Sequence, residues 1–359
     1  MNDDAHQQAE EKKWVMRARY QDDERRRRSD RETESVAVPN HLYHYTTLAG
    51  LQGIVETGGL WASDVRYMND SSELVYAHEL IQEVVHSKFS AVENNDLAQI
   101  LEKYEDFATD FSYESKPYIT CFCETDDLLS QWRGYSSQDV GVSLGFNFQM
   151  TALLGDLPPN TVLRKVVYDE GQQRAELESI VSTWLQTTMA LLDEGAELAA
   201  LFSNPAVIAL QSALRTSRLS FKHPTFREEN EWRLIKSIDT VAEVSRLEAQ
   251  RTNASIAEIG VVLGQYGIEF PGLPSVTPPF RTEGVEISFR RSALGLIPYV
   301  NMVIPDRAGV FHGRLPITSV RVGPSAHPQL AMESIALYLK SRGYGHHTDL
   351  LMSGVPLRY

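Results

Sequence analysis

The densest group of charged and aromatic side chains lies in the run Phe226–Ile235 (FREENEWRLI). If Glu231 begins a strand, then Glu229, Glu231 and Arg233 share one face while Trp232 and the leucine after Arg233 point into the core. Two carboxylates beside one arginine cost free energy if they are buried without a function, because like charges raise each other's pKa. The run therefore indicates a functional carboxylate site or, alternatively, an exposed strand face with an ordinary Glu231–Arg233 ion pair.

A second group, the run Ser130–Ser136 (SQWRGYS), lies between two segments that resemble strands. The rings of Trp132 and Tyr135 could stack on a planar heterocycle, and Arg133 beside them could bind phosphate or carboxylate. Because the two aromatic residues are three apart, they could instead share the core-facing side of a short helix. Tyr135 precedes a polar stretch, so we expect it to be the more accessible of the two.

A third group lies in the segment Leu42–Thr47 (LYHYTT). On a strand, His44 and Thr46 share one face, and Tyr45 lies on the other, so one face offers two hydrogen-bonding side chains. Taken alone, His44 fits a structural histidine better than a ligand-binding one. The pattern that follows it, a short helix and then a segment with a tryptophan and several aspartates, favours a functional role.

Apolar periodicity predicts the elements that position these groups. The segment Tyr118–Glu124 resembles a strand, and Val140–Phe146 alternates like a half-buried one. A short helix carrying Trp132 and Tyr135 is expected between them. The other expected elements are helices at about 48–56, 70–85, 172–220 and 328–342, and strands at about 42–47, 231–236, 285–291, 296–303 and 317–322. Strands towards both ends of the sequence, with helices between, predict an α+β domain.

Composition excludes several classes of protein. The 359 residues are 42% hydrophobic, and 34 basic against 48 acidic residues give a net charge of −14, which disfavours non-specific coating of nucleic acid. We find no apolar stretch of about 18 residues and no signal peptide, so a cytoplasmic protein without a membrane partner is expected. Cys121 and Cys123 are too few for a four-cysteine zinc site. We also find no phosphate-binding glycine loop and no paired metal-binding carboxylates, so a nucleoside triphosphatase and a nuclease are disfavoured.

Residues 1–35 contain nine basic and ten acidic residues, including the run Arg25–Arg28. This composition predicts a charged N-terminal extension that is flexible or a frayed helix, or alternatively a basic hook for RNA or a protein partner. Residues 36–359 are expected to form one domain with a helical insert at about 150–220.

Five motifs, read in order, resemble a large bacterial family of domains of unknown function. They are a HYTT strand, a CFCE strand followed by a helix with Trp and Tyr, a GVSLGF strand, the FxxExEWR run and an ITSVRVGP strand. The likeness covers most of residues 40–330. The order of key residues is in turn similar to the ADP-ribosyltransferase superfamily, in which a histidine or arginine, an aromatic or Ser-Thr-Ser strand and a glutamate surround NAD. The resemblance implies an ADP-ribosyltransferase-like split antiparallel sheet with surrounding helices.

By this resemblance, Glu231 would be the catalytic glutamate and Glu229 the first residue of a Glu-x-Glu pair that serves acceptor choice. His44 would bind an NAD ribose hydroxyl, and Tyr135 or Trp132 would stack on nicotinamide. The residues assigned to NAD binding are His44, Tyr45, Thr46, Trp132, Arg133 and Tyr135.

The implied function is NAD-dependent mono-ADP-ribosylation of a protein or nucleic-acid acceptor by a bacterial toxin or phage-defence effector. A carboxylate facing the ribosyl cation would stabilise the transition state more than the ground state. The alternatives are an NAD glycohydrolase, in which water is the acceptor, and a catalytically silent module that senses a nucleotide or a regulatory partner. We expect His44, Tyr135 and Glu231 to line one pocket, and we expect Glu231→Gln to leave folding nearly unchanged.

Overall fold

The computed structural model describes residues 38–68, 72–109, 116–135, 140–148, 157, 161–195, 204–238, 286–292, 295–306 and 309–356. The charged extension expected over residues 1–35 lies outside these ranges, and so does the expected start of the domain at residue 36. No helix in the described part of the chain is long and apolar enough to cross a membrane.

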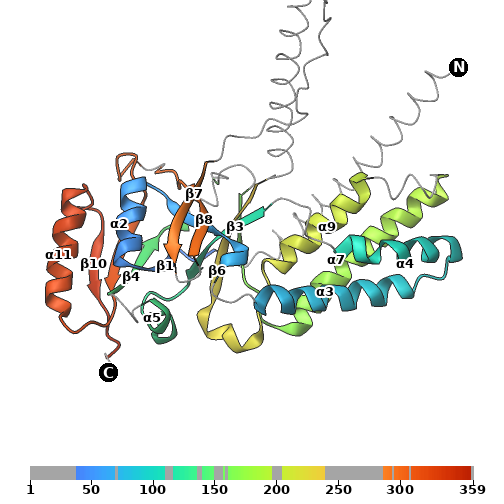
Figure 1. Cartoon of the computed structure of the whole chain (residues 1–359), viewed down its shortest axis with the longest axis horizontal. Coiled ribbons are helices and arrows are strands. Elements are labelled where there is room, and N and C mark those ends of the chain that lie inside the picture. Colours follow the sequence, from blue (N-terminus) through green and yellow to red (C-terminus); the bar gives the residue numbers. More distant parts are fainter. Residues whose placement is uncertain are drawn as a thin grey trace, which may run out of the picture.

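The centre of the molecule is one mixed sheet of ten strands, which confirms an α+β protein with a mostly antiparallel sheet (Figure 1). Eight strands follow the order β10-β9-β4-β1-β3-β2-β8-β7, while β6 pairs with β3 and β5 pairs with β6. Among these described pairs, the one between β9 and β10 is parallel and the rest are antiparallel. The strands are β1 Leu42–Thr47, β2 Leu60–Asp64, β3 Lys116–Cys123, β4 Gly141–Phe146, β5 Thr161–Lys165, β6 Glu231–Ile238, β7 Ile287–Ser292, β8 Gly295–Met302, β9 Ile317–Val322 and β10 Asp349–Met352.

The sheet opens between β1 and β3. The two strands are in register at a single pair, Tyr43 with Cys123, whereas further along the same edge β3 pairs with β2 at Ile119 and Tyr118. Within the described registers, residues 120–122 therefore have no strand partner on this edge. A backbone opening in the middle of a sheet leaves polar groups that side chains can reach.

Helices cover the two ends of the sheet (Figure 1). Four of them lie side by side at one end, and α2 and α11 lie at the other end. The helices are α2 Leu48–Thr57, α3 Ser72–Ser90, α4 Asn95–Thr109, α5 Leu129–Tyr135, α7 Glu170–Asp193, α9 Asn204–Arg218 and α11 Pro328–Ser341, with short 3₁₀ turns η1 Val65–Tyr67 and η2 Pro224–Glu229. Helix α2 ends at a glycine in the left-handed conformation, Gly58.

The four helices α3, α4, α7 and α9, which we call the helical unit, share a hydrophobic core of their own. Its members include Ile81 of α3, Leu101 of α4, Trp184 of α7 and Leu214 of α9. The expected helical insert at about 150–220 thus supplies half of the unit, since α3 and α4 come from residues 72–109. The same stretch also contains a strand, β5, which pairs with β6.

The prediction that Val140–Phe146 is half-buried was wrong, because all six residues of β4 are buried. Its apolar side chains, Val142, Leu144 and Phe146, belong to the hydrophobic core of the sheet, which we call the main core. Aromatic residues cover the face of β4 that contains its glycines. A Cβ on Gly145 would lie 3.1 Å from the ring of Tyr43, and one on Gly323 of the neighbouring segment would lie 2.8 Å from the ring of Trp132. Small residues alternate with apolar ones here because aromatic side chains pack directly on the backbone.

Candidate functional site

The run Glu231–Arg233 begins β6, as the sequence predicted, and its side chains alternate between two environments. Register places Glu231 opposite Cys123 and Arg233 opposite Cys121, so these four side chains share one face of the sheet. Trp232 projects to the other face and joins the main hydrophobic core. We call the face that carries Glu231, Arg233, Cys121 and Cys123 the polar face of the sheet.

Glu231 and Arg233 form a buried ion pair with two contacts. Arg233 Nε lies 2.9 Å from Glu231 Oε1, and Arg233 Nη2 lies 3.1 Å from Glu231 Oε2. Glu231 is 3% exposed and Arg233 is 2% exposed. The alternative of an ordinary exposed pair is therefore wrong, and the charges lie where their electrostatic interactions are strong.

Three further charged residues complete what we call the ion cluster: Glu73, Lys222 and Glu229. Lys222 Nζ lies 2.9 Å from Glu73, 2.6 Å from Glu229 and 3.1 Å from Glu231. Arg233 Nη2 also lies 2.6 Å from Glu73, which stands in the first turn of α3. The ion cluster holds three carboxylates and two cations, and it ties the helical unit to the sheet.

The structure differs from the prediction that Glu229 lies on the same strand face as Glu231. Glu229 is the last residue of η2, and Asn230, with φ of 41°, turns the chain before β6 begins. The two carboxylates nevertheless meet through Lys222, which contacts both. Glu73 and Lys222 were not predicted from the sequence. Their partner strand is distant in sequence from Glu73 and follows a turn after Lys222, so no local pattern marks either residue as its partner.

The ion cluster separates the acidities of its glutamates. Burial alone would raise the pKa of Glu231, but the charges of Arg233 and Lys222, with hydrogen bonds from Arg233 and Cys121, lower it to about 2. Burial raises the pKa of Glu229, and the neighbouring carboxylates Glu231 and Glu73 add to this, against the opposing effect of Lys222. Glu231 is thus held as an anion in a site largely removed from water.

Acid titration should reveal this anion in the stability of the protein. Because the folded-state pKa of Glu231 is about 2 and its ordinary value is 4.5, its contribution is complete above pH 4.5 and is lost between pH 4.5 and 2. The difference corresponds to about 3 kcal/mol of unfolding free energy. Denaturant unfolding at several pH values should show a gap between wild type and Glu231→Gln that closes over this window. The raised pKa of Glu229 acts on stability in the opposite direction. A stability gap between the two proteins that did not depend on pH would contradict the assignment to Glu231.

The aromatic residues of α5 and β1 divide into structural and accessible members. Trp132 is 2% exposed and its Nε1 donates to Asp127 Oδ1 at 2.7 Å, so it is a core residue. Tyr45 is also buried, and its hydroxyl donates to the Thr125 carbonyl and accepts from the Leu128 amide. Tyr135 is half-buried and stacks on Tyr45 with ring centroids 6.5 Å apart. Of the two sequence candidates for stacking, Trp132 is buried and Tyr135 is partly exposed.

His44 spans the opening between β1 and β3. Its Nδ1 lies 2.9 Å from the carbonyl oxygen of Cys121, one of the residues without a strand partner on that edge. Because a carbonyl can only accept, Nδ1 carries the proton, and a neutral ring then offers Nε2 as an acceptor. Burial and the charge of Arg290 lower the pKa of His44, against the opposing effect of the Cys121 carbonyl, which favours this neutral form.

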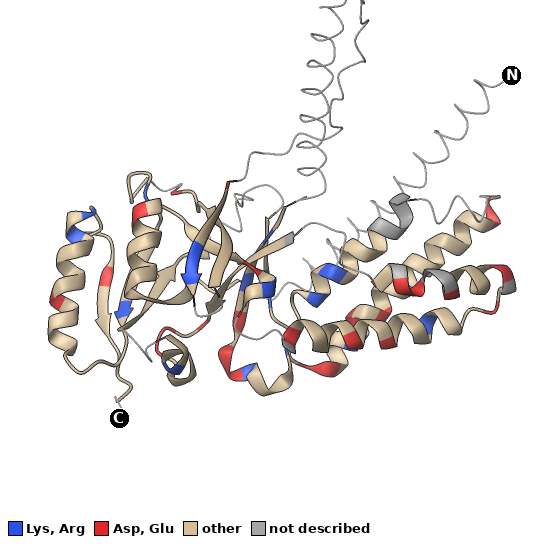
Figure 2. Cartoon of the chain, viewed as in Figure 1, with Lys and Arg blue, Asp and Glu red and all other residues tan. Residues whose placement is uncertain are grey.

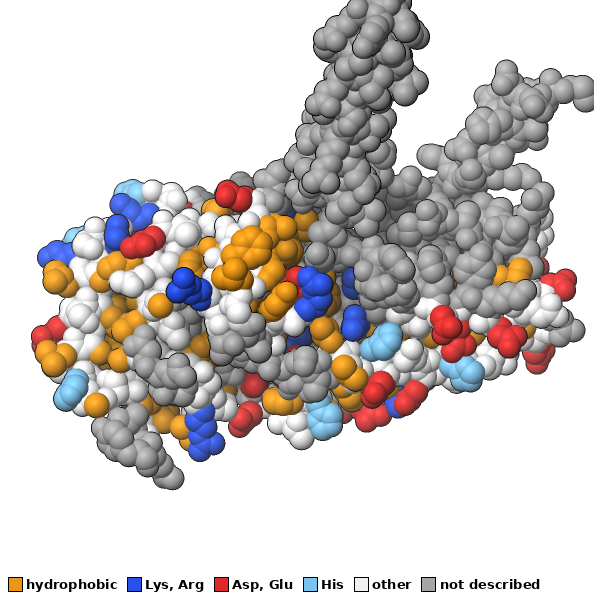
Figure 3. All heavy atoms as spheres, viewed as in Figure 1, with side chains coloured by type: hydrophobic (Ala, Val, Ile, Leu, Met, Phe, Trp, Pro, Cys, Tyr) orange, Lys and Arg blue, Asp and Glu red, His pale blue; other side chains and the backbone are white. Residues whose placement is uncertain are grey.

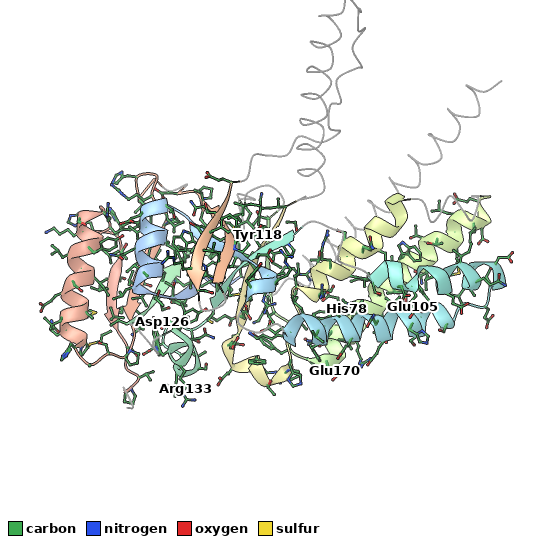
Figure 4. All side chains as sticks on the ribbon, viewed as in Figure 1. His78, Glu105, Tyr118, Asp126, Arg133 and Glu170 are labelled. Atoms are coloured by element: carbon green, nitrogen blue, oxygen red, sulfur yellow. The ribbon has the colours of Figure 1, made fainter. Side chains whose placement is uncertain are left out.

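The two remaining candidates lie away from the ion cluster. Thr46 packs against α2, where a Cβ on Gly50 would collide with its hydroxyl. Arg133 is exposed, and Figure 4 shows it at the outer side of α5, pointing away from the sheet. Neither side chain faces Glu231 in the arrangement of strands.

Electrostatic interactions connect Tyr135 with Glu231 and with Arg290. Burial raises the pKa of Tyr135, and the charge of Glu231 adds to this, whereas Arg290 opposes it. Arg290 also acts on His44. Register places the side chain of His44 on the opposite face of the sheet from Glu231, because its neighbour Tyr43 is paired with Cys123 and Cys123 is paired with Glu231. There the ring of His44 lies 5.8 Å from that of Phe122. Arg290, on β7, was not predicted from the sequence. It comes near the other candidates only because strands distant in sequence pair with one another, and no local pattern indicates such pairing.

A loop before α5 fixes the position of the helix through the C-terminal segment. Asp127 accepts hydrogen bonds from the Ser353 hydroxyl at 2.5 Å and the Gly354 amide at 2.8 Å, in addition to that from Trp132. Arg321 of β9 pairs with Asp126 at 2.8 Å. Figure 4 labels Asp126 between the sheet and α5. Residues far apart in sequence thus hold the helix that carries Tyr135.

The comparisons with known proteins name a family for part of the chain. No curated protein and no solved structure matches it. A profile of the family described as "Protein of unknown function (DUF2971)" matches residues 131–234, from α5 to β6. The matched stretch contains Trp132, Tyr135, Glu229 and Glu231, and the description assigns it no activity.

Proposed function

We propose that the chain is an NAD-dependent mono-ADP-ribosyltransferase, with NAD hydrolysis as the variant in which water accepts the ribosyl group. The observation that carries the proposal is Glu231, a carboxylate kept ionised at a pKa of about 2 on the same face as the half-buried ring of Tyr135. Cleavage of the bond to nicotinamide develops positive charge on the ribose, and a fixed anion stabilises that charge in the transition state. A role as a bacterial toxin or phage-defence effector extends this proposal.

The other candidate residues suit the same chemistry. Neutral His44 offers Nε2 as an acceptor for a ribose hydroxyl, and Tyr135 offers a ring face for nicotinamide. For Glu231 to bind the ribose, one of its oxygens must exchange Lys222 for the substrate. Lys222 would keep two carboxylate partners, Glu73 and Glu229, after releasing Glu231.

A second candidate is a catalytically silent module that senses a nucleotide or a partner through the same face. The observation that favours it is the occupation of both Glu231 oxygens by Arg233 and Lys222 at 3% exposure. In this case the ion cluster transmits binding to the helical unit instead of stabilising a cation.

Nicotinamide release separates the two candidates. Purified protein incubated with NAD labelled in the nicotinamide and in the adenylate should release nicotinamide if it is an enzyme, and release none if it is a sensor. Adenylate label that becomes attached to macromolecules of a cell extract indicates transfer, whereas free ADP-ribose indicates hydrolysis.

Glu229→Gln should impair transfer more than hydrolysis, because the first carboxylate of a Glu-x-Glu pair is expected to position the acceptor. The measurement is the ratio of attached to free adenylate label in the same reactions. Equal losses of both products would remove Glu229 from acceptor choice and leave it as a partner of Lys222.

A further inference from the structure

Arg290 occupies the polar face of the sheet, on the edge strand β7. Register places the preceding alternate residue, Ser288, opposite Tyr299, and Tyr299 opposite Ser63 of β2. Ser63 is in turn opposite Ile119, two residues before Cys121 on β3. Arg290 therefore projects on the same side of the sheet as Glu231 and Arg233.

The guanidinium of Arg290 is half-buried and has no carboxylate partner in the described part of the chain. Its Nη2 donates to the hydroxyl of Ser63 at 3.1 Å, and no acidic side chain in the described ranges lies within ion-pair distance. Arg233 and Lys222, two other cations of this face, are each paired with at least two glutamates. Removing a charge from water without a partner costs free energy, so an unpaired arginine here is a feature that stability alone does not explain.

The hydroxyl groups of two tyrosines act on this cation. Burial lowers the pKa of Arg290, against the opposing effects of the hydroxyls of Tyr135 and Tyr299, and Tyr299 stacks on Trp61 with ring centroids 4.8 Å apart. Figure 2 shows a basic segment on β7, the last strand in the described order of the sheet, while acidic residues gather on the helical unit. A positive group beside aromatic rings, in a protein of net charge −14, is suited to an anion that carries a planar base.

We propose that Arg290, positioned by Ser63, binds a phosphate group of the nucleotide that occupies the polar face. The guanidinium supplies two parallel N–H donors to phosphate oxygens, and Ser63 holds the fork in place through Nη2. The inference rests on the proposed function for the identity of the nucleotide, but the phosphate site itself follows from Arg290. A phosphate site at Arg290 would make phosphate a requirement for binding. NAD should therefore bind, and nicotinamide riboside, which lacks phosphate, should bind weakly.

Calorimetric titration of the full chain tests this with NAD, nicotinamide riboside and inorganic pyrophosphate. Arg290→Ala should weaken NAD and pyrophosphate binding by about tenfold to a hundredfold and leave riboside binding unchanged, because a charge-assisted hydrogen bond is lost. Arg290→Lys, which keeps the charge but not the fork, should lie between. The matched control is Arg291→Ala, because Arg291 is exposed and opposes Leu296 on the other face of β7. It should bind all three compounds like wild type.

The outcomes distinguish failure of this site from failure of the proposed function. Wild-type NAD affinity in Arg290→Ala, or equal losses in the two alanine variants, overturns the phosphate site even if nicotinamide is released. Binding of pyrophosphate that depends on Arg290, in a protein that neither binds nor cleaves NAD, supports the site and rejects the transferase. If Arg290→Ala does not fold, Arg290→Lys decides: wild-type affinity for pyrophosphate in that variant overturns the bidentate phosphate contact.

Discussion

Replacing Glu231 by glutamine should reduce nicotinamide release by about a hundredfold or more and also destabilise the fold by about 3 kcal/mol. The first effect follows from removing the anion that, in the proposed transferase, faces the ribosyl cation. The second follows from the structure, because the change leaves the buried cations Arg233 and Lys222 with less negative charge around them. The expectation from sequence that folding would barely change is therefore revised. Nicotinamide release and denaturant unfolding at pH 7 measure the two effects.

A surface carboxylate provides the matched control for this change. Glu56 pairs with Arg342 at 2.9 Å on exposed parts of α2 and α11, so Glu56→Gln should alter stability by less than about 1 kcal/mol and leave turnover unchanged. If Glu231→Gln turned over NAD at the wild-type rate while folded, the ion cluster would be a structural joint and the sensor would be the better proposal.

Truncating the two aromatic residues of α5 should give opposite patterns. Trp132→Ala should cost about 3 to 5 kcal/mol of unfolding free energy, because it leaves a cavity between Tyr45 and Gly323 and removes the hydrogen bond to Asp127. Tyr135→Ala should cost less stability, since that ring is half-buried, but should weaken NAD binding by about tenfold through loss of a stacking face. Thermal unfolding and calorimetric titration separate the two effects.

Leu129→Ala is the control on the same helix, because Leu129 is 46% exposed and should change neither property by more than about 0.5 kcal/mol. Weak NAD binding in a stably folded Trp132→Ala protein, with normal binding in Tyr135→Ala, would exchange the roles of the two rings.

Local patterns predicted most of the strands and helices because their signals lie within a few residues. The alternation that begins at Glu231 and the apolar stripe of α3 both appear in the structure at the expected places. Helix α4 was missed, although Leu97 and Leu101 are fully buried, and the short strands β2, β5 and β10 were missed as well. Short strands carry few alternations, so pairing partners rather than sequence define them.

The site was predicted in its local parts and missed in its long-range parts. The sequence placed Glu231 and Arg233 on one strand face and favoured Tyr135 over Trp132 as the accessible ring. It could not show that Glu73, from a helix more than a hundred residues earlier, reaches Arg233, or that Arg290 stands on the same face. The burial of the Glu231–Arg233 pair likewise depends on how the helical unit docks, which no local pattern encodes.

Figure 3 shows hydrophobic side chains gathered near the middle of the molecule, over the hairpin of β7 and β8, where Phe289 and Leu296 are each 62% exposed. They lie on the face of β7 opposite Arg290, so the proposed phosphate site and this apolar surface share one strand. A ligand that bound Arg290 and reduced the motion of β7 would therefore also reduce the motion of the apolar surface with Phe289 and Leu296.

The anchoring of α5 by Ser353 and Gly354 has a consequence for the newly made protein. During synthesis, β1, β3 and β6 leave the ribosome well before β9 and the segment that holds Asp127. Pairings between residues so distant in sequence form late in folding. The nascent chain therefore carries Glu231 and Tyr135 before the segment that holds Asp127, and through it α5, has been made.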